Sequence, residues 1–133
     1  MIQLFRVAFD MMRGNEMREI KFRGWDKVEK KWLYFNLYNV NLYQKELSNA
    51  VLDGLEFYLF TDLHDKNGKE IWEGDWFKSY WRVDPFIIIF FNGSFRGKYP
   101  KDDPEKGFHF DDYEAKNGKV IGDIYENPVR RGE

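Results

Sequence analysis

The amino-acid sequence predicts a mainly β protein, a small antiparallel barrel or a strongly bent antiparallel sheet, with additional N-terminal strands and room for one short helix. Three observations predict this class. Aromatic residues make up 20% of the chain, and flat rings suit a pleated, half-buried surface. Roughly eight short apolar runs are separated by turn-forming residues, with no helical segments alternating between them. Asn-Gly dipeptides occur at Asn67, Asn92 and Asn117, each beside an apolar run, and this dipeptide favours hairpin turns.

The first predicted hairpin lies near the N-terminus. Residues 18–25 alternate between apolar and charged side chains, with Ile20 and Phe22 on one face. This is the period of a half-buried strand. Polar residues at 26–31 form the predicted turn, and the aromatic run at 32–35 returns as the antiparallel partner.

The central hairpin carries the strongest local signal. Asn67-Gly68 lies between the apolar runs at 57–60 and 71–72. A type I′ turn needs positive φ at both central residues, and asparagine and glycine tolerate it best. The Glu-Gly-Asp turn at 73–75 follows at once. These residues define architecture rather than activity.

The remaining strands are expected in the second half of the chain. Asp84-Pro85 ends an aromatic run, and residues 86–91 are apolar enough for a buried strand that Asn92-Gly93 would end. The polar segment 99–107 is a predicted loop. Residues 43–52 have two interpretations, one short helix or a loop with a strand at 50–52. The strands predicted in this half span residues 76–83, 86–91, 108–110 and 120–125.

Residues 17–133 are predicted to form a single β domain, because a chain of 133 residues is long enough for one core. Residues 1–16 are interpreted as a leader translated from an upstream start codon, with Met17 as the true start. The alternative is a short amphipathic helix that docks on the domain or a partner. The segment does not resemble a signal peptide, and it is too short and interrupted to span a bilayer.

The composition excludes several classes of function. The formal net charge is −2, which argues against bulk attraction to nucleic acid or to an anionic membrane but leaves room for a local basic patch. The chain has no cysteine. Disulfides and thiolate chemistry are therefore excluded, and a reducing compartment fits.

No motif indicates catalysis, a metal or a cofactor. The two histidines, His64 and His109, lack a ligand spacing, and alternation of His109 with phenylalanines is typical of a residue facing out of a sheet. The acidic pairs at 102–103 and 111–112 lack the spacing of a calcium loop and are interpreted as solvated loop charge. Phosphate loops and nucleophile elbows are missing from the sequence. The sequence therefore predicts no enzyme.

The aromatic run after Asp75 is the best candidate for binding. In a strand starting there, alternate side chains share a face, and one set must face the core. Exposed rings beside cations are what single-stranded nucleic-acid platforms and peptide grooves use, whereas cross-strand aromatic packing is the structural alternative. Trp76, Lys78 and Tyr80 fall on one face, and Phe77, Ser79 and Trp81 fall on the other.

A further basic cluster is expected on the loop after Phe91. It contains Arg96, Lys98 and Lys101, and it would either contact phosphate or keep the loop soluble. The predicted binding residues are Trp76, Lys78, Tyr80, Arg82, Arg96 and Lys98.

Three ordered segments resemble the YopX family. Arg-Glu-Ile-Lys-Phe-Arg-Gly-Trp-Asp at 18–26 resembles its opening. The segment 61–75, from Thr61-Asp-Leu through Asn67-Gly68 to Glu-Gly-Asp75, resembles its central signature. Val-Ile-Gly-Asp-Ile-Tyr-Glu-Asn-Pro at 120–128 resembles its closing signature. This sequence departs from the family pattern at Gly24, where alanine is usual, at Asp62, where glycine is usual, and at Asp123, where asparagine is common.

The resemblance implies a protein encoded by bacteriophages or prophages, acting in the cytoplasm of the bacterial host. It also implies a mainly β fold containing a Src-homology-like small barrel. The family brings no established activity to carry over. We therefore hold two hypotheses: an accessory module that binds an unknown protein or nucleic acid without catalysis, and a structural protein whose strand edges and aromatic residues pair into a homo-oligomer.

Overall fold

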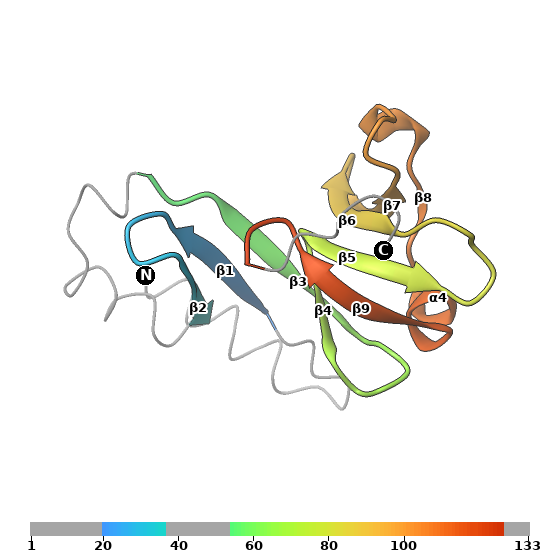
Figure 1. Cartoon of the computed structure of the whole chain (residues 1–133), viewed down its shortest axis with the longest axis horizontal. Coiled ribbons are helices and arrows are strands. Elements are labelled where there is room, and N and C mark those ends of the chain that lie inside the picture. The colour runs from blue at the N-terminus through green and yellow to red at the C-terminus, as the bar shows by residue number, and fades with distance from the viewer. Residues whose placement is uncertain (1–19, 37–53, 127–133) are drawn as a thin grey trace. The chain divides into compact units, whose positions relative to one another are not determined.

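The computed structural model describes residues 20–36 and 54–126. The chain divides into two compact units, Met1–Tyr58 and Leu59–Glu133, and the predictions for residues 1–16 and 43–52 lie outside the described residues. The strands are β1 (Lys21–Asp26), β2 (Lys31–Asn36), β3 (Phe57–His64), β4 (Glu70–Trp72), β5 (Asp75–Ser79), β6 (Phe86–Phe91), β7 (Ser94–Lys98), β8 (Phe108–His109) and β9 (Gly118–Asp123), with a 3₁₀ turn η1 (Pro104–Lys106) and a helix α4 (Asp112–Lys116) (Figure 1).

The hairpin of β1 and β2 confirms the first predicted pair. The strands are antiparallel, with Phe22 opposite Phe35 and their rings stacked at a centroid distance of 5.3 Å. Phe35 is buried with Leu33 in the core of this unit. The side chain of Asp26 orders the connecting turn, because its Oδ1 accepts the Val28 N–H at 2.9 Å.

The central hairpin of β3 and β4 is confirmed, but the predicted type I′ turn is not. The Gly68 N–H donates to the Asp65 carbonyl at 3.0 Å, and Gly68 has a φ of 81°, whereas Asn67 is not in the left-handed region. Asp65 explains the difference. Its Oδ1 accepts the N–H groups of Asn67 at 2.8 Å and Lys69 at 2.9 Å, which holds Asn67 in an ordinary Asx turn.

Replacing Gly68 with valine is expected to destabilise this unit by about 1–2 kcal/mol, because a residue with a Cβ is strained at positive φ. A Cβ at this position would meet no atom within 4 Å, so the cost is conformational rather than steric. Lys66→Ala in the same turn, at an exposed position, serves as the control and should change stability by less than about 0.5 kcal/mol. Equal shifts of the two variants in thermal melts would contradict this account of the turn.

The other two Asn-Gly dipeptides have different structures. Asn92 and Gly93 have φ values of 50° and 80° and join β6 to β7 with Phe91 opposite Ser94, which is the primed hairpin turn predicted there. Asn117 instead ends helix α4. The prediction of a third hairpin turn at that place was therefore wrong, because the preceding residues form a helix.

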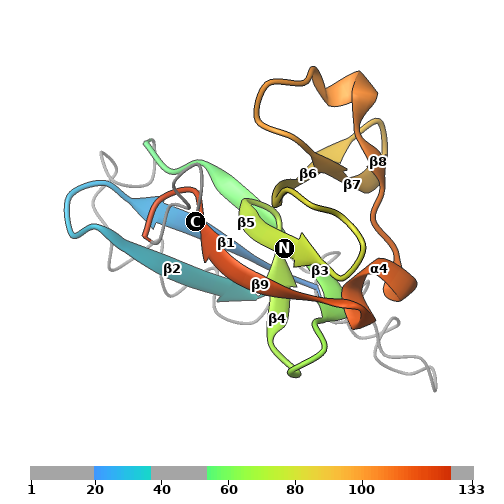
Figure 2. The same cartoon turned by 45° about the vertical axis from the view of Figure 1, so that its right-hand side comes forward.

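The strands form two antiparallel sheets, in the orders β2-β1-β3-β4 and β8-β7-β6-β5-β9. The mainly β, antiparallel prediction is confirmed. The described strands do not close into the predicted barrel, because β8 has only two residues and the chain then enters α4 before β9 pairs with β5 at the other edge (Figure 2). Strand β3 runs across the boundary between the two units.

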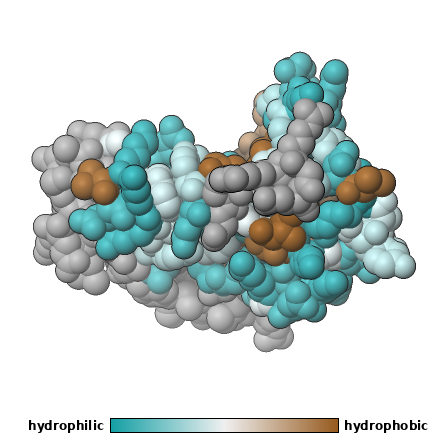
Figure 3. Space-filling view, viewed as in Figure 1, coloured by the Kyte–Doolittle hydropathy of each residue, from teal (hydrophilic) through white to brown (hydrophobic). Residues whose placement is uncertain are grey.

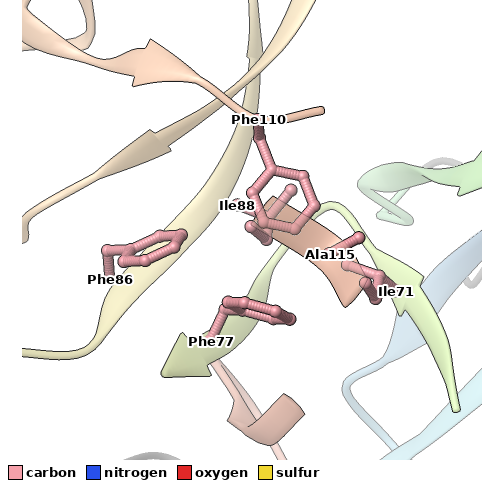
Figure 4. Packing of buried hydrophobic residues seen from close by; sticks show 6 residues of the cluster. All are labelled: Ile71, Phe77, Phe86, Ile88, Phe110 and Ala115. Atoms are coloured by element: carbon pink, nitrogen blue, oxygen red, sulfur yellow. The ribbon is translucent and has the colours of Figure 1, made fainter. Parts of the chain in front are cut away.

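The core of the second unit is a cluster of buried side chains from the central hairpin, the five-stranded sheet and helix α4. Phe77 on β5 is fully buried, and its ring contacts Phe110 edge-on at 5.0 Å and Phe86 at 5.6 Å. Figure 4 shows these rings turned toward one another. The cluster consists of Ile71, Phe77, Phe86, Ile88, Phe110 and Ala115.

Two elements differ from the sequence expectation. Residues 94–98, predicted as part of a loop, form strand β7. The acidic pair at 111–112, interpreted as solvated loop charge, instead lies at the start of helix α4. Asp111 caps that helix, since its Oδ1 accepts the Glu114 N–H at 3.0 Å. The predicted strand at 76–83 ends at Ser79.

Within the described ranges, no helix is long and apolar enough to cross a membrane.

Candidate binding surface

Strand β5 separates the core of the second unit from a partly exposed face of the sheet. Phe77 and Ser79 are buried, whereas Trp76 and Lys78 are only half-buried. The sequence prediction left open which set would face the core, and the structure assigns that place to Phe77 and Ser79. Because alternate residues point to opposite faces, Trp76 and Lys78 belong to the other face.

The register of the sheet shows which residues accompany them. Ile87 lies opposite Trp76, Lys98 lies opposite Ile87, and Lys119 lies opposite Lys78. Residues directly opposite one another share a face. We call this surface the outer face, and its members are Trp76, Lys78, Ile87, Ile89, Arg96, Lys98 and Lys119.

The cations of the outer face are held mainly by neutral groups. Lys78 Nζ donates to the carbonyl oxygens of Ser79, at 2.8 Å, and Arg82. Lys98 Nζ donates to the carbonyls of Tyr99 and Pro100, both at 3.2 Å. These carbonyls orient the ammonium groups without cancelling their charge, and each ammonium keeps a donor for a ligand.

The other two cations complete the basic character of this face. Arg96 Nε donates to Ser94 Oγ at 3.3 Å, its guanidinium lies 5.6 Å from the centre of the Phe91 ring, and Lys119 is exposed. The described ion pairs are Arg82–Glu114 and Lys116–Asp112. Thus no described carboxylate is paired with any of the four cations of the outer face.

Tyr80 follows directly after β5 and is 88% exposed. Its N–H donates to the Asn117 carbonyl at 2.8 Å, so the pairing of β5 with the β9 side continues by one residue. Tyr80 therefore lies two residues after Lys78 in the chain, just beyond the end of β5. The sheet brings four of the six predicted binding residues to the outer face, namely Trp76, Lys78, Arg96 and Lys98, and Tyr80 is exposed at its border.

Arg82 is the exception. Its guanidinium forms an ion pair with Glu114 Oε1 at 3.1 Å and lies 3.5 Å from the centre of the Phe108 ring. Glu114 also accepts the hydroxyl of the buried Ser79 at 2.9 Å. Arg82 therefore fastens the loop after β5 to helix α4, on the core side of the sheet.

Trp81 and Tyr113 form a second aromatic feature, which lies apart from the outer face. Their rings stack at 5.2 Å with an interplanar angle of 22°, and they are 43% and 67% exposed. The alternation predicted from the sequence grouped Trp81 with Phe77 and Ser79, and it gave no sign of Tyr113, because helix α4 was not predicted. On the side of the molecule shown in Figure 3, the coloured hydrophobic residues form separate small patches among hydrophilic ones.

Several residues of the segment 61–75 build turns rather than a chemical site. Thr61 Oγ1 donates to the Ile71 carbonyl at 2.6 Å, and Asp75 Oδ2 accepts the Trp72 N–H at 2.8 Å. Asp62 has a φ of 64° at an irregularity of the β3–β4 register, where a glycine would be unstrained. No cluster of three or more potential metal ligands occurs among the residues that the structure covers.

The comparisons with known proteins agree with this architecture. The chain is similar to the crystal structure of protein EF1440 from Enterococcus faecalis, with a TM-score of 0.51 and 22% sequence identity over 82% of this chain and 95% of that chain. At this identity the likeness shows the fold alone. A comparison with curated proteins found no match. The model of the YopX protein family matches residues 21–130, and the chain therefore belongs to the YopX protein family.

Proposed function

We propose that this protein is a non-catalytic binding module that holds an anionic partner on the outer face. We further propose that it is an accessory protein of a bacteriophage or prophage and acts in the cytoplasm of the bacterial host. The observation that carries the proposal is the grouping of Lys78, Arg96, Lys98 and Lys119 around Trp76 and Ile87.

The charge distribution supports an anionic partner. The whole chain has a formal net charge of −2, yet the four basic residues of the outer face have no paired carboxylate among the described residues. A local positive potential of this kind attracts anions even when the protein as a whole is acidic. Half-buried apolar side chains between the cations supply the contact area that binding requires.

Self-association through open strand edges is the alternative function, and the second sheet offers it little opportunity. The far edge of β9 is already occupied, because the Lys66 N–H donates to the Gly118 carbonyl and the Val120 N–H donates to Asp65 Oδ2, both at 3.0 Å. The opposite edge strand, β8, has two residues. Short and covered edges are how sheet proteins avoid pairing with one another. Light scattering of the full chain tests this alternative: the proposed function predicts a monomer, and a stable oligomer would favour self-association.

The double variant Lys98→Glu/Lys119→Glu is expected to elute from heparin-agarose, a polyanion, at clearly lower salt than the unchanged protein. These substitutions reverse two charges of the outer face, so repulsion replaces attraction. The matched control is Lys66→Glu/Lys69→Glu, which makes the same charge change at exposed positions of the central hairpin. Equal loss of retention in both variants would show that net charge, and not the outer face, determines binding.

A further inference from the structure

We infer that the anionic partner of the outer face is a single-stranded nucleic acid, with a base stacked on Trp76 and phosphates held by the surrounding cations. This inference rests on the proposed function and adds the chemical class of the partner. Trp76 lies opposite Ile87 on one side and Gly122 on the other. Glycine has no side chain to flank the ring, so nothing from that position on β9 covers it.

Cations flank this apolar centre in both directions along the strands. Lys78 lies two residues from Trp76 on β5, which is about 6.7 Å along a strand, and Lys119 lies beside Lys78. In the other direction, Arg96 lies opposite Ile89, two residues beyond Ile87. A ring with positive charges on either side is the arrangement that a single strand needs, because its bases stack while its backbone passes over cations.

Tyr80 extends the arrangement by a second ring. It follows Lys78 by two residues, just beyond the end of β5, and is 88% exposed, so ring, cation and ring succeed one another along the chain. Stacking of bases on aromatic rings tolerates any base sequence. Modest sequence preference is therefore expected.

A duplex and an acidic peptide fit this surface less well. In a duplex the faces of the bases are stacked inside, and only their edges are accessible in the grooves. An acidic peptide supplies carboxylates for the cations but no flat ring for Trp76. Unpaired bases satisfy both requirements at once.

Fluorescence anisotropy with a labelled oligothymidine of about 12 nucleotides, within the span of one small binding fold, tests the inference on the full chain. We expect the single strand to bind, and the same sequence as a duplex or a poly-glutamate competitor to bind clearly more weakly. Tyr80→Ala and Trp76→Leu are each expected to weaken binding of the single strand by about tenfold, as loss of one stacked base implies. Neither variant should change the dependence of the binding affinity on salt concentration, because neither removes a cation.

The cations give a separate signature. Lys119→Gln should reduce the steepness of log K against log salt by about 0.7, because one phosphate contact is lost. If poly-glutamate competes as well as the oligonucleotide, or if Tyr80→Ala and Trp76→Leu bind unchanged, the partner is not a single strand, although the proposed function stands. If none of these anions binds, and heparin retention is the same for the Lys98→Glu/Lys119→Glu variant and its control, both fail.

Discussion

Replacing Phe77 with alanine is expected to lower the free energy of unfolding by about 3–5 kcal/mol. Its ring is fully buried and contacts both Phe86 and Phe110, so truncation removes apolar contacts and leaves a cavity in the centre of the core. Urea unfolding monitored by circular dichroism measures the change. Tyr80→Ala is the control. It also removes an aromatic ring, three residues after Phe77 in the chain, but Tyr80 is 88% exposed. A comparable loss in both variants would contradict the assignment of the two faces.

Replacing Asp65 with alanine should cost at least about 3 kcal/mol, because hydrogen bonds to a charged group are worth about 1.5–3 kcal/mol each. Asp65 is 6% exposed, and its carboxylate accepts three backbone N–H groups, from Asn67, Lys69 and Val120. It therefore joins the hairpin turn to strand β9, whose residue Val120 lies 55 positions away in sequence.

Asp65→Asn separates the two parts of this role. The amide keeps one acceptor oxygen for the turn, but its NH₂ cannot accept the Val120 N–H. We expect a loss of about 1–3 kcal/mol, the cost of one unsatisfied buried group, which is smaller than that of Asp65→Ala. Thermal and urea unfolding of both variants and of Lys66→Ala would establish the order. An alanine variant as stable as Lys66→Ala would show that the Asp65 carboxylate does not hold the turn and β9 together.

Local sequence predicted the strands better than it predicted the turns between them. Strand β6 spans the predicted residues 86–91, because a short continuous apolar run is typical of a buried strand. The Asn-Gly dipeptides, in contrast, adopt three conformations. Asn92-Gly93 forms a primed turn. Asp65 imposes another geometry on Asn67-Gly68, and Asn117 caps the C-terminus of helix α4. The conformation of each turn therefore depends on the neighbouring side chains as well as on the dipeptide.

Strand β7 was missed because its defining contacts come from distant residues. Residues 94–98 contain two cations and a glycine, a composition typical of a loop. A Cβ at Gly97 would lie 2.4 Å from the Phe108 ring and 2.6 Å from Phe86. Glycine is thus required where two core rings approach the backbone, a requirement that only the folded sheet reveals.

The candidate surface could be predicted in part. Alternation along β5 placed Trp76 and Lys78 together, and the structure agrees. Arg82 was included because the strand was expected to continue, but the strand ends at Ser79 and Arg82 turns to Glu114. Lys119 was missed, because its place opposite Lys78 depends on pairing between strands that are distant in sequence.

Mapping of backbone amide chemical shifts by NMR, during titration of the full chain with the oligothymidine, tests the central claim most directly. We expect the largest shifts at Trp76, Lys78 and Tyr80 and at the outer-face residues of β7 and β9, including Lys98 and Lys119. The central hairpin at 65–69, which has exposed lysines of its own, should be unaffected. Shifts that concentrate on that hairpin or on Trp81 and Tyr113, or that are absent from the outer face, would contradict the account.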